Sequence, residues 1–327
     1  MRRLRLVSIV AVVATAALAC GGCGTPSFLI TPVSNTQKLR ETPVSGGSGS
    51  DKIALIEVEG MLINARTGGF MQPTENKVSL FKEQLNRAAA DKNVKAIVLR
   101  VNSPGGTVTA SDTMYELLTR FRERTKKPII ASLQEVAASG GYYVACAADE
   151  IVASPTSVVG SIGVIVNTFD ASRGLDKLGI RSEAIKSGPL KDMGSPFKAM
   201  TVDERAVMQG MVDEYYARFL EVVKGNRNLG TDEKARLATD GRVFSGRKAL
   251  EAGLVDRVGL LEDAIKLARQ TAKAPRARAI MYKRPYGFSG SIYANGSTPT
   301  PNANVTYLQI PGTDSILPTG FYYLWQP

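Results

Sequence analysis

Residues 94–106 read VKAIVLRVNSPGG, an apolar run that ends in a proline and two glycines. The branched aliphatic residues of 94–101 predict a buried strand. Gly105 and Gly106 follow this strand, and glycines at the carboxyl end of a strand let backbone N–H groups turn toward a ligand, as an oxyanion hole requires. A tight turn would use the same two residues. The stretch therefore predicts a strand and places a candidate site at its end.

Strand and helix patterns alternate on both sides of this stretch. A β-rich run at 53–58 precedes it, with apolar residues at helical spacing in between. A capping box that begins at Thr109 predicts a helix leading to a strand at 128–133, and a second box, Thr201 with Glu204, predicts the start of a long helix. The alternation predicts an α/β fold with a largely parallel sheet flanked by helices.

A second glycine-flanked serine lies in ASGGYY, residues 138–143. Ser139 is expected where a loop ends and a helix begins, so that its hydroxyl lies near the positive end of the helix and the amide of Gly140 is another candidate oxyanion donor. A serine at this position is most often a helix N-cap. Ala137 stands where the nucleophile elbow of α/β hydrolases, G-x-S-x-G, has its first glycine, so the motif is not that elbow.

The chain contains no histidine, which removes every Ser/His/Asp and Cys/His catalyst. A serine nucleophile then needs another base, and a desolvated lysine amine can serve. Lys191 lies in SGPLKD, after a stretch, 181–186, that predicts a strand. An exposed amine titrates near pH 10.4, and bringing it to neutrality takes roughly 4 kcal/mol of desolvation. A catalytic Lys191 therefore requires a covered apolar cleft, with Asp192 pointing away; otherwise it is a solvated surface charge.

The first 19 residues predict export, because arginines precede an apolar run at 6–18 that is short for a membrane span. The small residues before Cys20 resemble a lipoprotein signal, with Cys20 as the lipidated residue and Cys23 as the alternative. An uncleaved membrane anchor is the competing interpretation, and either places the body outside the cytoplasm on a membrane. Cys20 and Cys23 also form a C-x-x-C pair, but without histidine or a second pair we expect no metal site.

Five motifs, taken together and in order, resemble the signal peptide peptidase A family, serine peptidases of the ClpP/crotonase superfamily. They are VNSPGG at 101–106, ASGGYY at 138–143, VGSIGV at 159–164, SGPLKDMGSPF at 187–197 and DGRVFSG at 240–246. The resemblance covers roughly residues 52–273, and the separation of Ser139 from Lys191 is similar to that in the short, single-domain members. It implies the superfamily's superhelix of repeated ββα and βα units.

The resemblance also implies a Ser/Lys dyad. Ser139 would be the nucleophile and Lys191 the general base, which later protonates the leaving amine. Ser161 would orient the lysine through a hydrogen bond. Three glycine amides would form the oxyanion hole: Gly105, Gly106 and Gly140.

The same resemblance implies a ring or dome in which the serine of one subunit meets the lysine of its neighbour. A bound peptide would pair as an added strand, and small pockets would choose short apolar side chains. Remnants of cleaved signal peptides and other unfolded peptides near the membrane would be the substrates. The net charge of +11 is scattered without interleaved aromatics, so we expect no nucleic-acid partner. With no Walker loop and no His/Cys ligand set, we also expect no cofactor.

Four segments are expected along the chain. A signal peptide or anchor at 1–19 precedes a flexible tether at 20–50 that is rich in Pro, Thr, Ser and Gly. The peptidase domain spans 51–273, and a C-terminal extension spans 274–327. The aromatic end of the extension, 321–325, is expected to lie as a strap over the protein's own body, with docking on another subunit as the alternative.

Two other functions are compatible with this fold. A crotonase-type acyl-CoA enzyme would use the glycines on a thioester, but export argues against it because coenzyme A is scarce outside the cytoplasm. A catalytically inactive lipoprotein scaffold would keep the fold without turnover, and the intact dyad argues against it.

Overall fold

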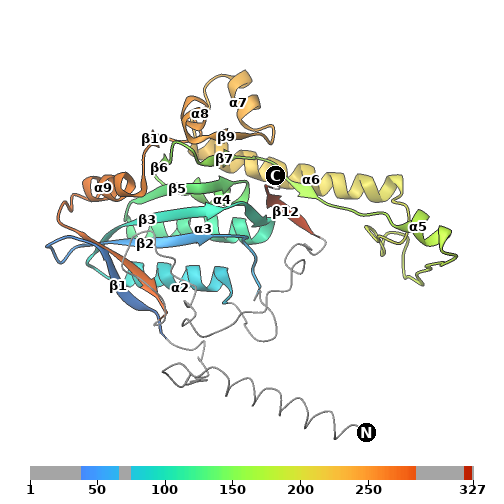
Figure 1. Ribbon diagram of the computed structural model, residues 1–327, viewed down its shortest axis with the longest axis horizontal. Coiled ribbons are helices and arrows are strands. Elements are labelled where there is room, and N and C mark those ends of the chain that lie inside the picture. The colour runs from blue at the N-terminus through green and yellow to red at the C-terminus, as the bar shows by residue number, and fades with distance from the viewer. Residues whose placement is uncertain (1–37, 66–74, 285–319, 326–327) are drawn as a thin grey trace, which may run out of the picture. The chain divides into compact units, whose positions relative to one another are not determined.

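A sheet of nine strands lies at the centre of the described part of the chain (Figure 1). The computed structural model describes residues 38–65, 75–284 and 320–325. The expected signal peptide at 1–19 and the candidate lipidation residues Cys20 and Cys23 lie outside the described residues.

The sheet is mostly parallel. Its central strands lie parallel to one another in the order β2, β3, β5, β6 and β10. They span Lys52–Glu59, Val94–Ser103, Ile129–Ala138, Glu150–Ala153 and Arg257–Val258. The α/β class and the largely parallel sheet are therefore confirmed.

Helices cover both faces of the sheet. Along β3, Ile97 and Leu99 face α2, α3 and α4, whereas Ala96 and Val98 face α9. These helices span Lys77–Ala90, Val108–Thr125, Gly140–Ala145 and Leu261–Thr271. Because β3 is buried on both faces, its sequence is a continuous apolar run rather than an alternation of apolar and polar residues.

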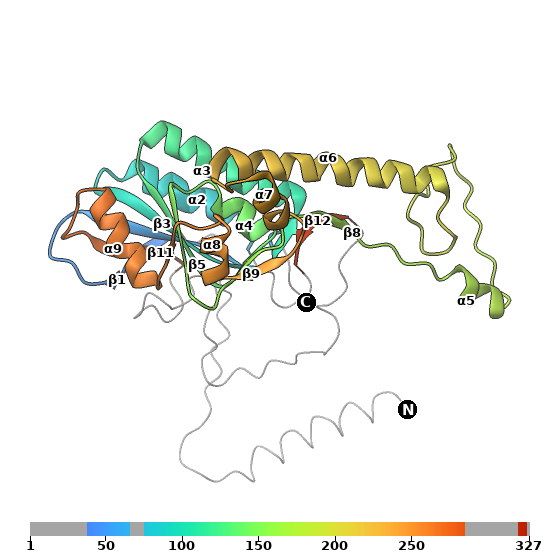
Figure 2. The ribbon, with the colours of Figure 1, turned by 90° about the horizontal axis from the view of Figure 1, so that it is seen from above.

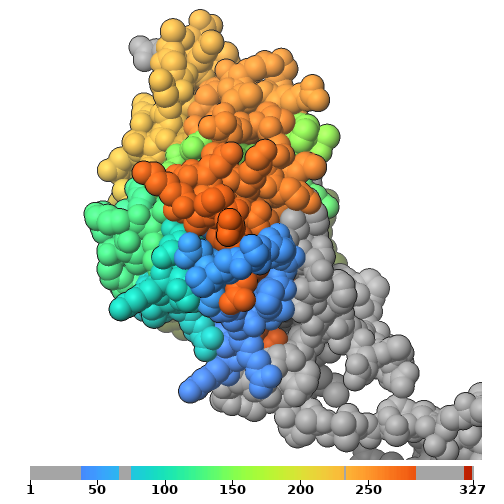
Figure 3. All heavy atoms as spheres, turned by 90° about the vertical axis from the view of Figure 1, so that its left-hand side faces the viewer, coloured from blue at the N-terminus to red at the C-terminus, as the bar shows by residue number. Residues whose placement is uncertain are grey.

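The sheet extends beyond the limits expected for the peptidase domain. β1 (Arg40–Ser45) lies within the stretch expected as a tether, and β11 (Arg278–Lys283) lies past residue 273. β11 pairs parallel with β2 and antiparallel with β1, which forms the edge. Figure 3 faces this side of the molecule, with the N-terminal segment in blue beside the C-terminal segment in orange. Pro43 is tolerated in β1 because an edge strand need not donate every N–H to a neighbour. A proline does not indicate a strand in the sequence, so β1 was not expected.

A second, three-stranded sheet joins distant parts of the chain. β12 (Phe321–Leu324) lies between β4 (Gly105–Thr107) and β8 (Ile165–Val166) and is antiparallel to both. The other short elements are β7 (Val158–Gly160), α7 (Asp232–Ala238), β9 (Val243–Ser245) and α8 (Gly246–Glu251). β7 pairs with both β5 and β9, and its last residue, Gly160, lies opposite Ala138 at the end of β5.

One of the two expected capping boxes is present. Thr201 accepts the N–H of Glu204 and the Glu204 carboxylate accepts the N–H of Thr201, at 3.2 and 3.0 Å, and α6 (Val202–Asn226) follows. The expectation for α3 was wrong by two residues. Its N-cap is Thr107, which accepts the N–H of Ala110, whereas Thr109 lies inside the helix.

Residues 167–200, which we call the arm, lead from β8 to the start of α6 and are mostly exposed. Figure 2 shows the arm, with α5 (Ser172–Lys177), beyond the end of α6 that is remote from the sheet. The strand expected at 181–186 is absent, and Ile185 in it is fully exposed. The residue types of this segment favour a strand, but among the described residues no sheet edge pairs with the segment and no core covers it. Within the described ranges, none of the helices has the length and hydropathy of a membrane span.

Candidate active site

Ser139 lies at the junction of β5 and α4 in a backbone conformation that residues other than glycine rarely adopt. Its φ is 50° and its ψ −117°. Such a conformation costs about 1–3 kcal/mol and persists where the surroundings fix it. Here the Ser139 N–H donates to Gly160 O at 2.7 Å, and its carbonyl accepts the N–H of Tyr143 at 2.8 Å. Ser139 occupies the N-cap position of α4, as expected, but its side chain makes no capping hydrogen bond.

The Ser139 hydroxyl is buried without a partner. The residue is 1% exposed, and its Oγ has no hydrogen-bond partner among the described residues. A buried, unsatisfied hydroxyl costs about 1–3 kcal/mol, and such groups in native proteins call for an explanation, of which a catalytic role is one. Strain and an unsatisfied polar atom therefore coincide at one residue.

Gly105 and Gly140 lie against each other beside this hydroxyl. Parallel pairing of β3 with β5 sets Ser103 opposite Ala137, which brings the ends of both strands together. A Cβ added to Gly105 would lie 2.7 Å from Gly140 N, and Gly105 has a φ of 106°. A Cβ added to Gly106 would lie 2.0 Å from Leu62 O. Only glycine fits this close approach of three backbone segments.

Ser103 also belongs to the site, although the sequence analysis predicted no role for it. Its side chain is buried and donates to Gly60 O at 2.6 Å, while its Oγ accepts the N–H of Gly105 at 3.1 Å. The hydroxyl therefore fixes the turn that presents the two glycines. A serine two residues before the turn glycine is a local signal for such a bond.

Ser161 is placed next to the same strand end. β7 pairs with β5 through Ala138 and Gly160, and Ser161 follows directly, with a φ of 51°. Its N–H donates to Arg242 O at 2.8 Å, in the DGRVFSG motif. The structure therefore brings together Ser139, Ser161 and the glycines of the two loops.

Lys191 is not part of this cluster within one chain. It lies in the arm and is exposed, whereas the Ser139 hydroxyl is buried and unpartnered among the described residues. The described residues of the same chain therefore do not form the covered cleft expected around Lys191.

The carboxylate of Asp192 is held by two lysines of the arm other than Lys191. Its Oδ1 lies 2.7 Å from Lys186 Nζ and 3.0 Å from Lys198 Nζ. Hydrogen bonds from Lys186 and Lys198 lower the pKa of Asp192. Lys198 also pairs with Glu204 of the α6 capping box, so these contacts tie the segment around Lys191 to the start of α6.

Asp192→Asn is expected to loosen this part of the arm. Ion pairs at the surface stabilise only weakly, so amide hydrogen exchange in residues 187–198 should accelerate by several-fold and no more. Because the pKa of Asp192 is lowered in the folded protein, its contribution is present above the unfolded pKa of roughly 4 and is lost as the pH falls through the folded value. Exchange of the wild type below pH 4 should approach that of the variant, whereas Asp176→Asn, in α5, should change neither.

Two family models match the chain. Residues 122–275 match Peptidase family S49, and residues 50–159 match Clp protease. The second match agrees with the ClpP-like arrangement of a mostly parallel sheet flanked by helices.

Several relatives share most of this region. A SppA homologue of Enterococcus faecium is 34% identical over 261 residues, which are 80% of this chain and 75% of that protein. Serine protease SPPA of Arabidopsis thaliana, a chloroplastic protein, is 33% identical over 229 residues, 69% of this chain and 33% of that one. Protease 4 of Salmonella typhi is 38% identical over 192 residues, 58% of this chain and 30% of that one. This chain therefore belongs to peptidase family S49, the serine peptidases that include SppA and Protease 4.

Proposed function

We propose that this protein is a serine endopeptidase whose catalytic dyad, Ser139 and Lys191, is completed between two subunits. The observation that carries the proposal is the strained, buried Ser139, whose hydroxyl has no partner among the described residues of its own chain. A nucleophile held in this way needs a base from elsewhere, and the exposed Lys191 of another copy is the candidate.

The chemistry follows from the placement of these groups. Ser139 Oγ attacks the carbonyl carbon of the peptide while Lys191 Nζ takes its proton. The carbonyl oxygen gains negative charge, which two of the three candidate glycine amides stabilise. The third, the amide of Gly105, donates to Ser103 Oγ and holds the turn. The lysine then gives its proton to the leaving amine, and a water that it deprotonates hydrolyses the acyl ester. The glycines in question are Gly105, Gly106 and Gly140.

The arm has the character of a surface that another subunit covers. Large apolar side chains along it are 50–104% exposed, and a concentration of such residues marks an interaction site. They are Phe169, Leu178, Ile180, Ile185 and Phe197. Burial of this segment against the Ser139 end of a neighbour would also remove water from Lys191, which a lysine base requires.

The location and substrates in the proposal rest on the N-terminal sequence. An exported chain held at a membrane, by a lipid on Cys20 or by an uncleaved helix, would place the body outside the cytoplasm. There it would meet cleaved signal peptides and other unfolded peptides. We place the catalytic domain between the tether and the C-terminal extension, with β11 and the edge strand β1 completing its sheet.

Mixing two inactive variants tests the shared site. In an equal mixture of Ser139→Ala and Lys191→Ala chains, random exchange gives about a quarter of the interfaces one intact serine and one intact lysine. We expect about a quarter of the wild-type activity per interface, measured with an unfolded protein substrate. A mixture of Ser139→Ala with the double variant has no complete dyad and is the control. Exchange without recovery of activity would place the base within the same chain.

A further inference from the structure

Helix α6 connects the arm to the body of the protein. It spans Val202–Asn226 and is therefore about 37 Å long. Its second half packs into the core through Phe219, Val222 and Val223, whereas its first half leads away from the sheet to the arm (Figure 2). The place at which Lys191 is presented to a neighbour therefore depends on how firmly each half of α6 is held.

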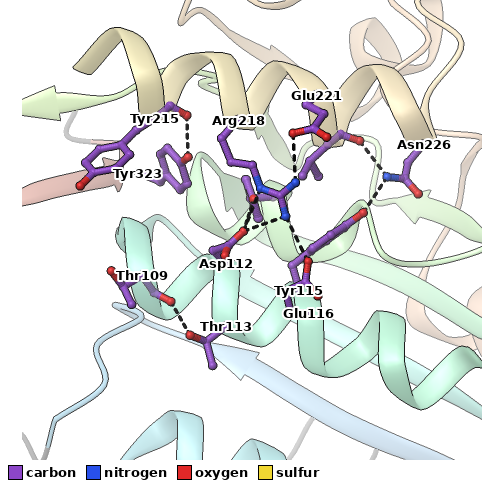
Figure 4. Close-up of polar contacts among 12 residues, drawn as sticks. Thr109, Asp112, Thr113, Tyr115, Glu116, Tyr215, Arg218, Glu221, Asn226 and Tyr323 are labelled. Carbon is purple, nitrogen blue, oxygen red and sulfur yellow. Dashed lines mark hydrogen bonds and ion pairs between the residues drawn. The ribbon is translucent and has the colours of Figure 1, made fainter. Parts of the chain in front are cut away.

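The second half of α6 is tied to α3 by a cluster of charged residues. Arg218 of α6 lies 3.3 Å from Asp112 and 3.1 Å from Glu116, both in α3 (Figure 4). The Tyr143 hydroxyl of α4 donates to the same Asp112 carboxylate at 2.5 Å. Because α4 begins directly after Ser139, one carboxylate connects the helix that follows the nucleophile to the helix that carries the arm.

The arm covers the first half of α6 at two residues on one face. Glu204 and Met208 are 1% and 8% exposed, whereas most residues around them in the helix are exposed. Residues at this spacing are neighbours on a helix surface. A Cβ added to Gly194 of the arm would lie 2.8 Å from Met208 Cε, and Lys198 of the arm pairs with Glu204. One apolar and one ionic contact therefore hold the arm on α6.

The ion pair of Glu204 continues to the residue after Lys191. Lys198 pairs with Glu204 and also lies 3.0 Å from Asp192, and Lys186 lies 2.7 Å from the same Asp192 carboxylate. The hydrogen bond between the two side chains lowers the pKa of Glu204 and raises the pKa of Lys198, so both are charged at neutral pH. Both carboxylates are thereby paired with lysines other than Lys191.

We propose that Glu204 is a positioning residue for the general base: through Lys198 and Asp192 it fixes Lys191 on α6, in the place from which the lysine reaches the Ser139 of a neighbouring subunit. This role rests on the proposed function and adds to it a residue that takes no part in proton transfer. The sequence conceals the role, because a glutamate at this position of a helix is already explained by the capping box. The cap does not require the ion pair with the arm.

Glu204→Gln separates the ion pair from the cap. A glutamine can still accept the N–H of Thr201, so the capping box remains, but the charge that holds Lys198 is lost. We expect kcat for cleavage of an unfolded protein to fall about tenfold with KM within about twofold of wild type, because a displaced base slows the chemical step and leaves substrate binding intact. Lys198→Met should match this loss, whereas Lys198→Arg keeps the charge and should retain most of the activity.

Thr201→Ala is the matched control, since it removes the other half of the capping box. The Thr201 hydroxyl accepts the N–H of Glu204 at 3.2 Å, and its loss leaves the pair with Lys198 in place. We expect kcat within about twofold of wild type. Equal losses in the Thr201 and Glu204 variants would show that the start of the helix matters rather than the ion pair, and would overturn the proposal. An unchanged kcat in folded Glu204→Gln would overturn it too.

Mixing with inactive chains shows to which half of the shared site Glu204 belongs. In an equal mixture with Ser139→Ala, the Glu204→Gln chain supplies the serine and its partner supplies an intact arm, so about a quarter of the interfaces should have wild-type activity. In an equal mixture with Lys191→Ala, none of the interfaces has an intact arm with its lysine, and activity should stay at about one-twentieth of wild type. The reverse order, or recovery in neither mixture when Ser139→Ala and Lys191→Ala restore each other, contradicts the proposal.

Amide hydrogen exchange separates this proposal from the peptidase function. Glu204→Gln should accelerate exchange in residues 187–198 by several-fold, and Thr201→Ala should not, whether or not the protein cleaves peptides. A wild-type protein that cleaves nothing, while its arm responds in this way, would refute the peptidase function alone. An active enzyme whose arm exchanges equally fast with and without the Glu204 charge would refute the positioning role alone.

Discussion

Ser139→Ala and Lys191→Ala are each expected to lower kcat for peptide cleavage by about 10⁴-fold or more. Each variant removes one residue of the proposed Ser/Lys dyad, and in that mechanism neither residue acts without the other. Steady-state cleavage of a denatured protein by the purified assembly measures the loss. Lys177→Ala removes another exposed lysine of the same arm and should keep wild-type activity.

The stability of the two variants should set them apart from ordinary loss-of-fold mutations. Ser139→Ala removes a buried hydroxyl that has no partner among the described residues, so the free energy of unfolding should stay equal or rise by about 1 kcal/mol. Lys191 is exposed, and its loss should change that free energy by about 0.5 kcal/mol at most. Thermal unfolding measures both. Cleavage retained by either folded variant would remove the dyad from the mechanism.

Local sequence patterns predict the parts of the site that short segments determine. The strand 94–101 was recognisable because burial on both faces selects a continuous run of aliphatic residues. The glycines after it marked a candidate site, although a tight turn would use the same two residues. Parallel strand ends meet at one edge of a sheet, so the expected meeting of Gly105 with Gly140 follows from two local assignments.

Contacts between distant segments explain what the sequence could not predict. β1 and β11 have no strong strand pattern of their own in the sequence. β1 pairs with β11, and β11 pairs with β2, which lies more than 200 positions away in the chain. The expectation of a strand at 181–186 was wrong for the opposite reason. Its residue types favour a strand, but none of the described strands pairs with it. The ring of Tyr323 in β12 packs against Tyr143 of α4 and Phe219 of α6, and no spacing in the sequence predicts these contacts.

Gly105→Ala is expected to lower kcat by about 10²- to 10³-fold, the usual cost of one oxyanion donor. The φ of 106° at this residue is unfavourable for alanine. The added Cβ would also lie 1.9 Å from Tyr323 O and 2.7 Å from Gly140 N. Both atoms belong to the backbone, so relief requires that β12 leave and that the loop after Ser139 shift. The amides would then no longer converge on the carbonyl oxygen.

The kinetic pattern distinguishes this effect from general damage. A displaced oxyanion donor lowers kcat and kcat/KM together, because it acts mainly in the transition state. Gly210→Ala is the matched control, since its added Cβ meets nothing within 4 Å on α6. It should keep full activity and stabilise the helix by about 0.5–1 kcal/mol. A folded Gly105→Ala enzyme with wild-type kcat would show that the turn at Gly105 does not position the oxyanion donors.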